Sequence, residues 1–344
     1  MAITINDIAE RAQVSLATVS RVINNSGYVS EATRKKVLRV IEELDYTPNG
    51  IARNLSKNEP NTIGVIVPDI TNSYFGEIIK GISEVAETKD FNIVFFNTDD
   101  NIDKEIRALR LLKKQGVKGV IMTPAFGEDE FNSEYLNALE NMEVPLVLAA
   151  SSVKYAKLNG VFVDNIKGAF DAVNYFIKEG HTKIGIITGR LNSEPALDRL
   201  NGYKKALAFN NIGINEDYIF RGDYRLRTAY DITKEVLDMK DGPTALLISS
   251  NMMTLGCIRA MYSENKSIPE DLAIIGFDKL DLLDILGIGI SYVDDSPVEL
   301  GRAAANMLLE LSEGTEKKDI KEITISPNLV LKGSEKFQIN RKGV

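Results

Sequence analysis

Residues 14–22 read Val-Ser-Leu-Ala-Thr-Val-Ser-Arg-Val, and this stretch decides how the N-terminal part of the chain is interpreted. Ser15 suits the N-cap of a helix, because its hydroxyl can accept a bond from a free backbone amide. Val19, Val22 and Ile23 follow at helical spacing and form one apolar stripe. The opposite face is mostly small, polar or cationic and consists of Leu16, Ala17, Thr18, Ser20, Arg21 and Asn24. The pattern predicts a helix that is buried on one side and presents the other side to a partner.

One short helix is expected before this helix and another after it. The first covers about residues 6–12, and the bridge of residues 13–15 is only a few residues long. Ser30 is a suitable N-cap for the third helix, whose apolar positions lie between residues 37 and 44. Two short helices joined this closely form a helix-turn-helix, whose second helix enters the major groove of DNA. The sequence therefore predicts a DNA-binding headpiece.

Two runs near the N-terminus carry a family pattern. Residues 4–24 fit T-I-x-D-I-A-x-x-A-x-V-S-x-x-T-V-S-R-V-x-N, and residues 46–55 fit Y-x-P-N-x-I-A-R-x-L. Together they resemble the headpiece and hinge of the LacI/GalR family of bacterial repressors. The resemblance implies that DNA is contacted by Thr4, Ser15, Leu16, Ala17, Thr18, Ser20, Arg21, Asn24, Asn49, Ala52 and Leu55. Leu16 and Ala17 would discriminate bases by apolar contact, and Leu55 would wedge into the minor groove.

The headpiece and the hinge each depart from the family pattern at one position. Gln13 stands where the family often has Gly, and we expect this change to be harmless. Gly50 stands where the family often has Ala, and Gly in a helix costs about 1 kcal/mol relative to Ala. We therefore expect a hinge that folds reluctantly when the dimer docks on DNA. The alternative for Leu55 is an ordinary linker residue.

Composition excludes several classes of protein. The 344 residues carry a net charge of −8, yet the first sixty residues are close to balance, so the acidic excess lies further along. Cys257 and His181 are each the only residue of their type, which argues against a disulfide framework, a zinc site and a histidine-dependent triad. The N-terminus is not a signal peptide, and no apolar run could span a bilayer. We expect a cytoplasmic protein that has no membrane partner, cofactor or metal and is not an enzyme.

From Ile63 onward, short apolar strands alternate with amphipathic helices, and the pattern begins again at Val161. Repeated strand–helix units predict α/β architecture with doubly wound parallel sheets. The resemblance extends over this part and implies a two-lobed, periplasmic-binding-protein-like clamshell, with an effector between the lobes at the carboxyl ends of strands. The expected domains are a helix-turn-helix headpiece at 1–46, a hinge at 47–60, an N-terminal lobe at 61–160 and 294–324, a C-terminal lobe at 161–293 and 325–332, and a loose tail at 333–344.

Polar and aromatic side chains near strand ends are the candidates for the effector site. Planar charged or amide groups pair with adjacent hydroxyls, and aromatic faces cover the apolar side of a sugar ring. The resemblance assigns this role to Tyr74, Phe75, Arg199, Tyr224, Asn251 and Asp278. Structural alternatives remain: core packing for Tyr74 and Phe75, a surface salt bridge for Arg199, and an N-cap of the next helix for Asp278.

The other acidic residues near strand ends receive structural interpretations. Asp164 is expected to cap a helix rather than to contact a ligand. The pairs Asp99–Asp100 and Asp294–Asp295 look like solvated loops. The second pair adds negative charge near the crossover between the lobes, which disfavours a sugar phosphate as the effector.

We interpret the sequence as a transcriptional regulator, expected to be a repressor of carbohydrate-related genes. As a homodimer it would bind a double-stranded DNA operator under allosteric control by a small sugar-like effector. The headpiece and residues 147–151 also resemble catabolite control regulators, so a phosphorylated phosphocarrier protein is the alternative co-regulator. A solute-binding protein or sugar-modifying enzyme that carries a headpiece is the rival of another class. The missing signal peptide and the single His181 count against that rival.

Overall fold

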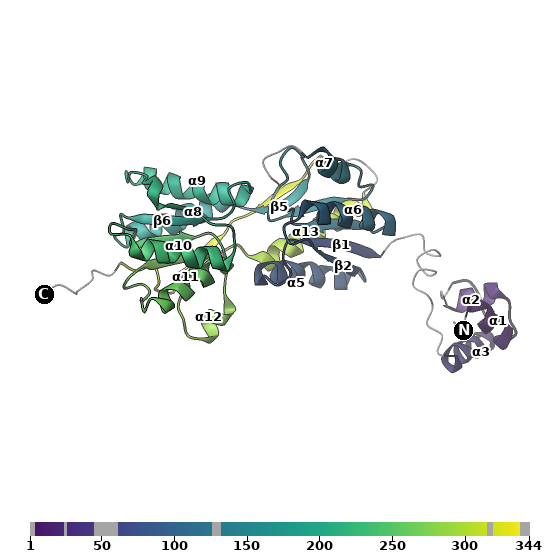
Figure 1. The fold of residues 1–344 in the computed structure, drawn as a ribbon. Coiled ribbons are helices and arrows are strands. Elements are labelled where there is room, and N and C mark those ends of the chain that lie inside the picture. The colour runs from purple at the N-terminus through teal and green to yellow at the C-terminus, as the bar shows by residue number, and fades with distance from the viewer. Residues whose placement is uncertain (1–3, 24–25, 45–60, 126–131, 315–318, 338–344) are drawn as a thin grey trace. The chain divides into compact units, whose positions relative to one another are not determined.

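The computed structural model describes residues 4–23, 26–44, 61–125, 132–314 and 319–337 (Figure 1). The chain forms two compact units, Met1–Asn61 and Thr62–Val344. Among the described residues, no helix combines the length and the apolar character that crossing a membrane requires.

The first unit is a three-helix headpiece. Its helices α1 (Ile5–Ala12), α2 (Leu16–Ile23) and α3 (Glu31–Glu43) pack on one shared apolar core. The Ser15 hydroxyl accepts the Thr18 amide at 3.2 Å, and the Ser30 hydroxyl accepts the Thr33 amide at 3.3 Å. Both N-caps predicted from the sequence are therefore confirmed, and Ser15 fixes the start of the recognition helix.

The bridge between α1 and α2 bends through Gln13. This residue has φ of 49°, in the left-handed region that glycine adopts most easily. Its amide bonds to the Glu10 carbonyl at 3.1 Å, and the Val14 amide bonds to the Ala9 carbonyl at 3.0 Å, which closes α1. The geometry explains why the family pattern has Gly here, since a side chain in this conformation costs about 1–2 kcal/mol, and it corrects the expectation that Gln13 is harmless.

The first lobe of the second unit is built on a six-stranded parallel sheet. Its strands lie in the order β11 (Glu322–Ile325), β5 (Asn159–Val163), β4 (Leu146–Ala149), β3 (Gly119–Met122), β1 (Thr62–Val67) and β2 (Asn92–Asn97). One face packs against α5 (Ser73–Thr88) and α13 (Pro297–Glu313), and the other against α6 (Ile102–Gln115) and α7 (Ser133–Glu140). Neighbouring residues Val65 and Ile66 belong to different cores, which is why the strands read as continuous apolar runs.

The second lobe repeats the plan. Its strands lie in the order β12 (Asn328–Val330), β10 (Ser291–Asp294), β9 (Ala273–Phe277), β8 (Ala245–Ile248), β6 (Ile184–Thr188) and β7 (Ile219–Arg221), and only the β10–β12 pair among them is antiparallel in the described part. The helices are α8 (Asn165–Lys178) and α9 (Glu194–Phe209) on one face, α10 (Leu226–Asp238) and α11 (Asn251–Ser263) on the other, with the shorter α12 (Asp281–Ile285) and η1 (Glu216–Tyr218).

The structure corrects two of the expected domain limits. The limit between residues 160 and 161 falls inside β5, which pairs with β4 and β11 and so belongs to the first lobe. The expected loose tail begins too early, because Ser334 and Glu335 are each 2% exposed. The Ser334 hydroxyl donates to the Ile274 carbonyl at 2.7 Å, which holds the segment on the second sheet.

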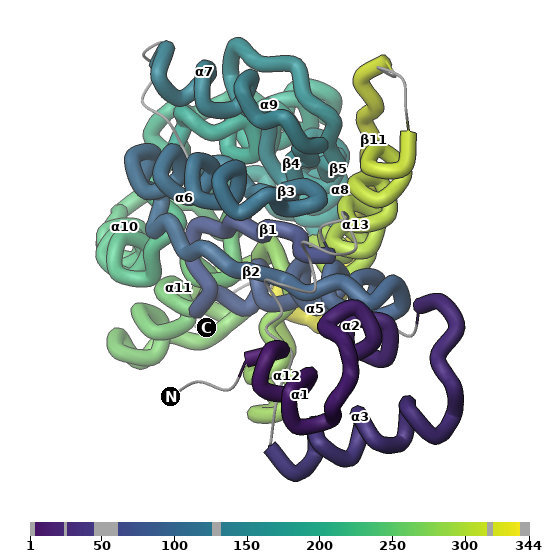
Figure 2. The backbone as a smooth tube through the Cα atoms, turned by 90° about the vertical axis from the view of Figure 1, so that its right-hand side faces the viewer, coloured from purple at the N-terminus to yellow at the C-terminus, as the bar shows by residue number. Residues whose placement is uncertain are grey.

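Helices α5 and α13 meet in direct backbone contact (Figure 2). A Cβ on Gly81 would lie 2.0 Å from the Val298 carbonyl oxygen, and a Cβ on Gly301 would lie 2.1 Å from the Ile78 carbonyl oxygen. Glycine is therefore required at both positions for the helices to approach this closely. The contact attaches the helix that follows β10 of the second lobe to the first lobe.

Adding a methyl group at this contact is expected to destabilise the chain. Gly81→Ala should lower the free energy of unfolding by about 1–3 kcal/mol, because the methyl overpacks a backbone contact. Gly76→Ala is the matched control in the same helix, since no described atom lies within 4 Å of its Cβ position. The control should raise stability by about 0.5–1 kcal/mol. Urea unfolding of the whole chain checks this, and equal effects of the two changes would contradict the close approach.

Candidate functional site

The exposed face of α2 carries the DNA-contacting residues expected from the sequence. Val19 and Val22 are buried, whereas Leu16 is 48% exposed and Ala17 and Arg21 are exposed beside it. The remaining expected contacts on or near this helix are the half-buried Thr18 and Ser20 and the exposed Thr4 and Ser15. Asn24, Asn49, Gly50, Ala52 and Leu55 lie outside the described residues.

The six expected effector residues all line one cleft of the second unit. This cleft has a volume of about 150 Å³ and is bounded by side chains from both lobes. Its lining includes the expected set of Tyr74, Phe75, Arg199, Tyr224, Asn251 and Asp278. The carboxyl ends of β1, β8, β9 and β10 bring these side chains and their neighbours together, as parallel sheets allow.

Two aromatic side chains enter the cleft from the first turn of α5. The Asn72 side chain accepts the Tyr74 amide at 3.1 Å and so begins the helix at the edge of the cleft. The rings of Tyr74 and Phe75 meet edge to face at a centroid distance of 5.4 Å. Both side chains also pack on the core of the first lobe. Core packing and a position in the cleft lining are therefore compatible for these two residues.

Arg199 lies at the centre of the cleft wall and is 6% exposed, so it forms no surface salt bridge. Its guanidinium stacks on the Phe277 ring at 3.8 Å. Its Nε donates to Asn165 at 2.7 Å, and its two Nη atoms donate to the Ser249 carbonyl at 2.7 Å and to Asp295 at 2.9 Å. These bonds fix the side chain before any ligand arrives.

Asp278 and Asp295 flank Arg199 from the ends of two neighbouring strands. Asp278 accepts the Asn251 amide at 3.3 Å, whereas the N-cap of the following helix α12 is Leu280, so the capping alternative is wrong. Asp295 is 1% exposed, which corrects its interpretation as part of a solvated loop. In each carboxylate, the buried Oδ1 atom has no hydrogen-bond partner among the described residues.

Burial controls the protonation of both acids. Burial, together with the neighbouring Asp278, raises the pKa of Asp295 to about 7 against the attraction of Arg199. Burial likewise raises the pKa of Asp278, although Arg199 and the Asn251 amide oppose the shift. The expected cap at Asp164 is confirmed, since its side chain accepts the Lys167 amide at 2.9 Å.

Polar contacts join the two lobes across the cleft. The Asn251 side-chain amide donates to Asn72 at 2.7 Å and to Ser73 at 3.2 Å, so this expected effector residue also bridges the lobes. Tyr224, with φ of 67°, bonds through its hydroxyl to Ser193 at 3.1 Å within the second lobe.

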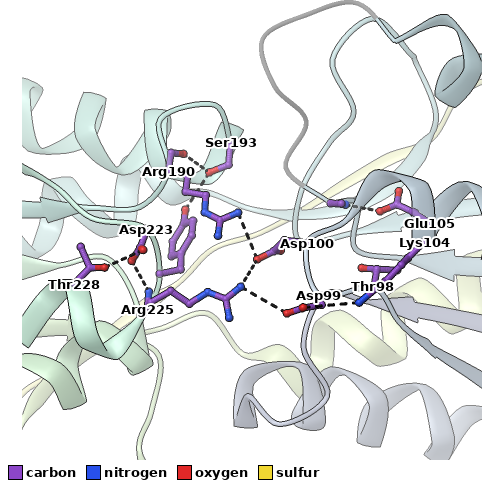
Figure 3. A network of polar contacts seen from close by, with 12 residues as sticks. Thr98, Asp99, Asp100, Lys104, Glu105, Arg190, Ser193, Asp223, Arg225 and Thr228 are labelled. Atoms are coloured by element: carbon purple, nitrogen blue, oxygen red, sulfur yellow. Dashed lines mark hydrogen bonds and ion pairs between the residues drawn. The ribbon is translucent and has the colours of Figure 1, made fainter.

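A charged network lies beside these contacts (Figure 3). Arg225 of the second lobe lies 3.7 Å from Asp99 and 3.5 Å from Asp100 of the first lobe. Arg190 approaches Asp100 at 3.6 Å. Asp100 is therefore not a solvated loop residue, which corrects its interpretation from the sequence, as for Asp295. Both lie directly or closely after a strand, as Asp278 does, and this position was the available signal; a second adjacent acid in each case favoured the solvated-loop interpretation instead.

Replacing Asp295 is expected to change the pH dependence of stability. Because the folded-state pKa of Asp295 lies near 7 and the ordinary value is 3.8, the folded chain holds a proton between these limits that the unfolded chain has released. The bound proton therefore stabilises the folded chain most below pH 4. This contribution is lost as the pH rises from about 4 through the folded-state pKa of about 7. Asp295→Asn should make the fall in stability between pH 5 and 7.5 shallower, by up to about 1.4 kcal/mol per pH unit.

Thermal unfolding across this pH range checks the expectation. Glu105 is also buried, and burial raises its pKa to about 7. The variant should therefore retain the part of the pH dependence of stability that Glu105 contributes. Asp294→Asn is the matched control: its side chain accepts the Ser296 amide at 2.9 Å through an oxygen that Asn retains, and its charge is the smallest of the named influences on the pKa of Asp295, so the slope should change far less. An unchanged slope in Asp295→Asn would show that Asp295 is ionised throughout.

Comparison with known proteins agrees with this geometry. Residues 4–49 match the family described as bacterial regulatory proteins, lacI family, and residues 60–332 match periplasmic binding proteins and sugar binding domain of LacI family. Catabolite control protein A of Priestia megaterium is 36% identical over 310 residues, which cover 90% of this chain and 92% of that protein. The transcriptional repressor CytR of Escherichia coli K12 is 34% identical over 313 residues, 91% of each chain.

A solved structure of similar architecture covers nearly the whole chain. The lac repressor dimer bound to operator and the anti-inducer ONPF has a TM-score of 0.84 and 26% identity, over 98% of this chain and 100% of that chain. The family that this chain matches, and the relatives named above, are transcriptional regulators and not enzymes. The rival interpretation as a sugar-modifying enzyme is therefore wrong. The chain belongs to the LacI family of bacterial transcriptional regulators, with a helix-turn-helix DNA-binding region and a periplasmic-binding-protein-like domain for an effector.

Proposed function

We propose that this regulator is a repressor that binds a near-palindromic operator as a homodimer. The observation that carries the proposal is the exposed face of α2, where Leu16, Ala17 and Arg21 are open to a partner while Val19 and Val22 are buried. A recognition helix of this kind reads base edges in the major groove, and two copies read two half-sites. The similarity to a lac repressor dimer on its operator supports the same arrangement here.

The cleft is the proposed site of a small, polar, sugar-like effector. Aromatic rings of Tyr74 and Phe75 line it together with the carboxylates of Asp278 and Asp295, which matches the mixed apolar and polar surface of a sugar. A regulator named CelR, solved as a complex with cellobiose, shares the fold with a TM-score of 0.71 and 25% identity over 96% of this chain. On this basis the regulated genes concern carbohydrates.

The effector would act by changing the contacts between the lobes. Bonds from Asn251 to Asn72 and Ser73 and ion pairs from Arg225 to Asp99 and Asp100 cross the cleft. A ligand that binds one arrangement of the lobes more tightly shifts the population toward it. The similarity to catabolite control protein A keeps a phosphorylated phosphocarrier protein as the alternative co-regulator.

Selection of DNA by the full-length protein tests the operator half of the proposal. Duplexes recovered from a random library should share a near-palindromic sequence. Arg21→Ala should weaken binding to the selected duplex by about 1–3 kcal/mol, since one positioned Arg contact to DNA is lost.

Arg39→Ala is the matched control, because it removes the same charge from α3, where Arg39 pairs with Glu43 at 3.0 Å. Its effect should be several-fold smaller. Equal losses for the two variants would mean that α2 supplies only general charge, and recovery of no common sequence would contradict a sequence-specific regulator.

A further inference from the structure

The charges around Arg199 do not balance. Its guanidinium is bonded to Asp295 at 2.9 Å and is also attracted to Asp278, so two carboxylates face one cation in the buried wall of the cleft. The other bonds of Arg199 run to the uncharged Asn165 and to the Ser249 carbonyl. When both acids are ionised, this cluster carries one excess negative charge.

The remaining charged residues of the cleft leave this excess in place. Asp100 lies near Arg190 and Arg225, at 3.6 and 3.5 Å, so these groups compensate one another at a separate position. Asp69 accepts both the amide and the hydroxyl of Thr71, at 2.9 and 2.6 Å, within its own loop. None of these contacts reaches Asp278 or Asp295 among the described residues.

Each of the two acids has an oxygen that lacks a donor. The Oδ1 atoms of Asp278 and Asp295 are buried and have no hydrogen-bond partner in the described part of the chain, and both residues line the cleft. The same is true of Asp100 Oδ1, but there Arg190 and Arg225 already compensate the charge. An ionised carboxylate only accepts hydrogen bonds, and leaving a buried acceptor unpaired is costly. A ligand that supplies donors there, and a positive charge with them, would remove both penalties.

The rings that line the cleft favour the same ligand chemistry. Tyr74, Phe75 and Tyr224 line it together with the two acids, and aromatic faces attract cations. Burial and the proximity of Asp278 raise the pKa of Asp295 to about 7, so a proton relieves the excess charge when no ligand does. A bound cation would take the place of that proton.

We propose that the effector carries a protonated amino group, as an amino sugar does, which binds against Asp278 and Asp295, and that ligands bearing phosphate or carboxylate are rejected. This inference rests on the proposed function of the cleft as the effector site. It assigns the cleft a ligand class by charge, with Asp295 as the residue that sets the preference. Like charges in a desolvated wall would repel an anionic ligand.

Matched sugars test the preference on the full-length protein. Thermal shift titrations would compare glucose, galactose and mannose with their 2-amino-2-deoxy forms and their 6-phosphates. At least one amino sugar should bind about 10-fold or more tightly than its parent, as expected when a hydrogen bond gains a full charge, and its 6-phosphate counterpart more weakly than the parent. Asp295→Asn should reduce the preference for the amine to a few-fold or less.

Two further variants make the result interpretable. Asp294→Asn removes a neighbouring carboxylate that does not line the cleft, and it should leave the preference intact. If Asp295→Asn does not fold, Asp278→Asn tests the same loss of preference for the amine. The comparison of ligands on the unaltered protein needs no variant.

The outcomes separate this inference from the proposed function. If a neutral sugar binds as tightly as its amine, the ammonium preference is wrong while the sugar effector stands. If a phosphate binds most tightly, the charge argument itself is wrong. If none of the nine compounds binds, both the amine and the proposed sugar-like effector are contradicted.

Discussion

The buried ion pair between Arg199 and Asp295 is the interaction on which the arrangement of the two lobes depends. Asp295 lies where the chain passes from β10 of the second lobe to α13 of the first. Asn165, which accepts another bond from Arg199, lies where the chain passes from β5 of the first lobe to α8 of the second. One guanidinium therefore joins two of the segments that connect the lobes, and it also holds the end of β8 through the Ser249 carbonyl.

Through Arg199, a ligand in the cleft would influence both of these connecting segments. A buried pair is not stabilising by itself, since desolvation of the two charges offsets most of their attraction, but breaking it is costly. A ligand that compensates Asp278 and Asp295 changes the charge felt by Arg199 and hence by both connecting segments. The bonds from Asn251 and Arg225 to the first lobe then favour or oppose one arrangement of the lobes. This is a coupling free energy between sites, in which the ligand biases an existing structural equilibrium.

Local pattern was sufficient for most of the fold. The caps at Ser15, Ser30 and Asp164 follow from their hydroxyl or carboxylate side chains, and the apolar runs predicted the central strands because both faces of each sheet are covered. Short edge strands were missed: β11 spans Glu322–Ile325 with alternating exposure, and β7 and β12 have three residues each. Their pairing depends on a neighbouring strand far away in sequence. For the same reason, β5 was assigned to the wrong lobe.

The candidate site shows the same division between local and distant information. The family pattern identified Tyr74, Phe75, Arg199, Tyr224, Asn251 and Asp278, and all of them line the cleft. It could not identify Asp295, because adjacent acids in a sequence usually mark a solvated loop. Only the packing of the crossover against α9 shows that Asp295 is buried against Arg199. The charge of the cleft is therefore a property of the tertiary structure.

If the cleft holds the effector, a ligand bound there changes the affinity of the headpiece for its operator. The most direct measurement is operator affinity with and without a saturating cleft ligand, and ligand affinity with and without operator. Each partner is expected to change the affinity of the other by the same factor, between about 5-fold and 150-fold. A ligand whose binding is abolished by Asp278→Asn, yet which leaves the operator affinity of the unaltered protein unchanged, would contradict this coupling.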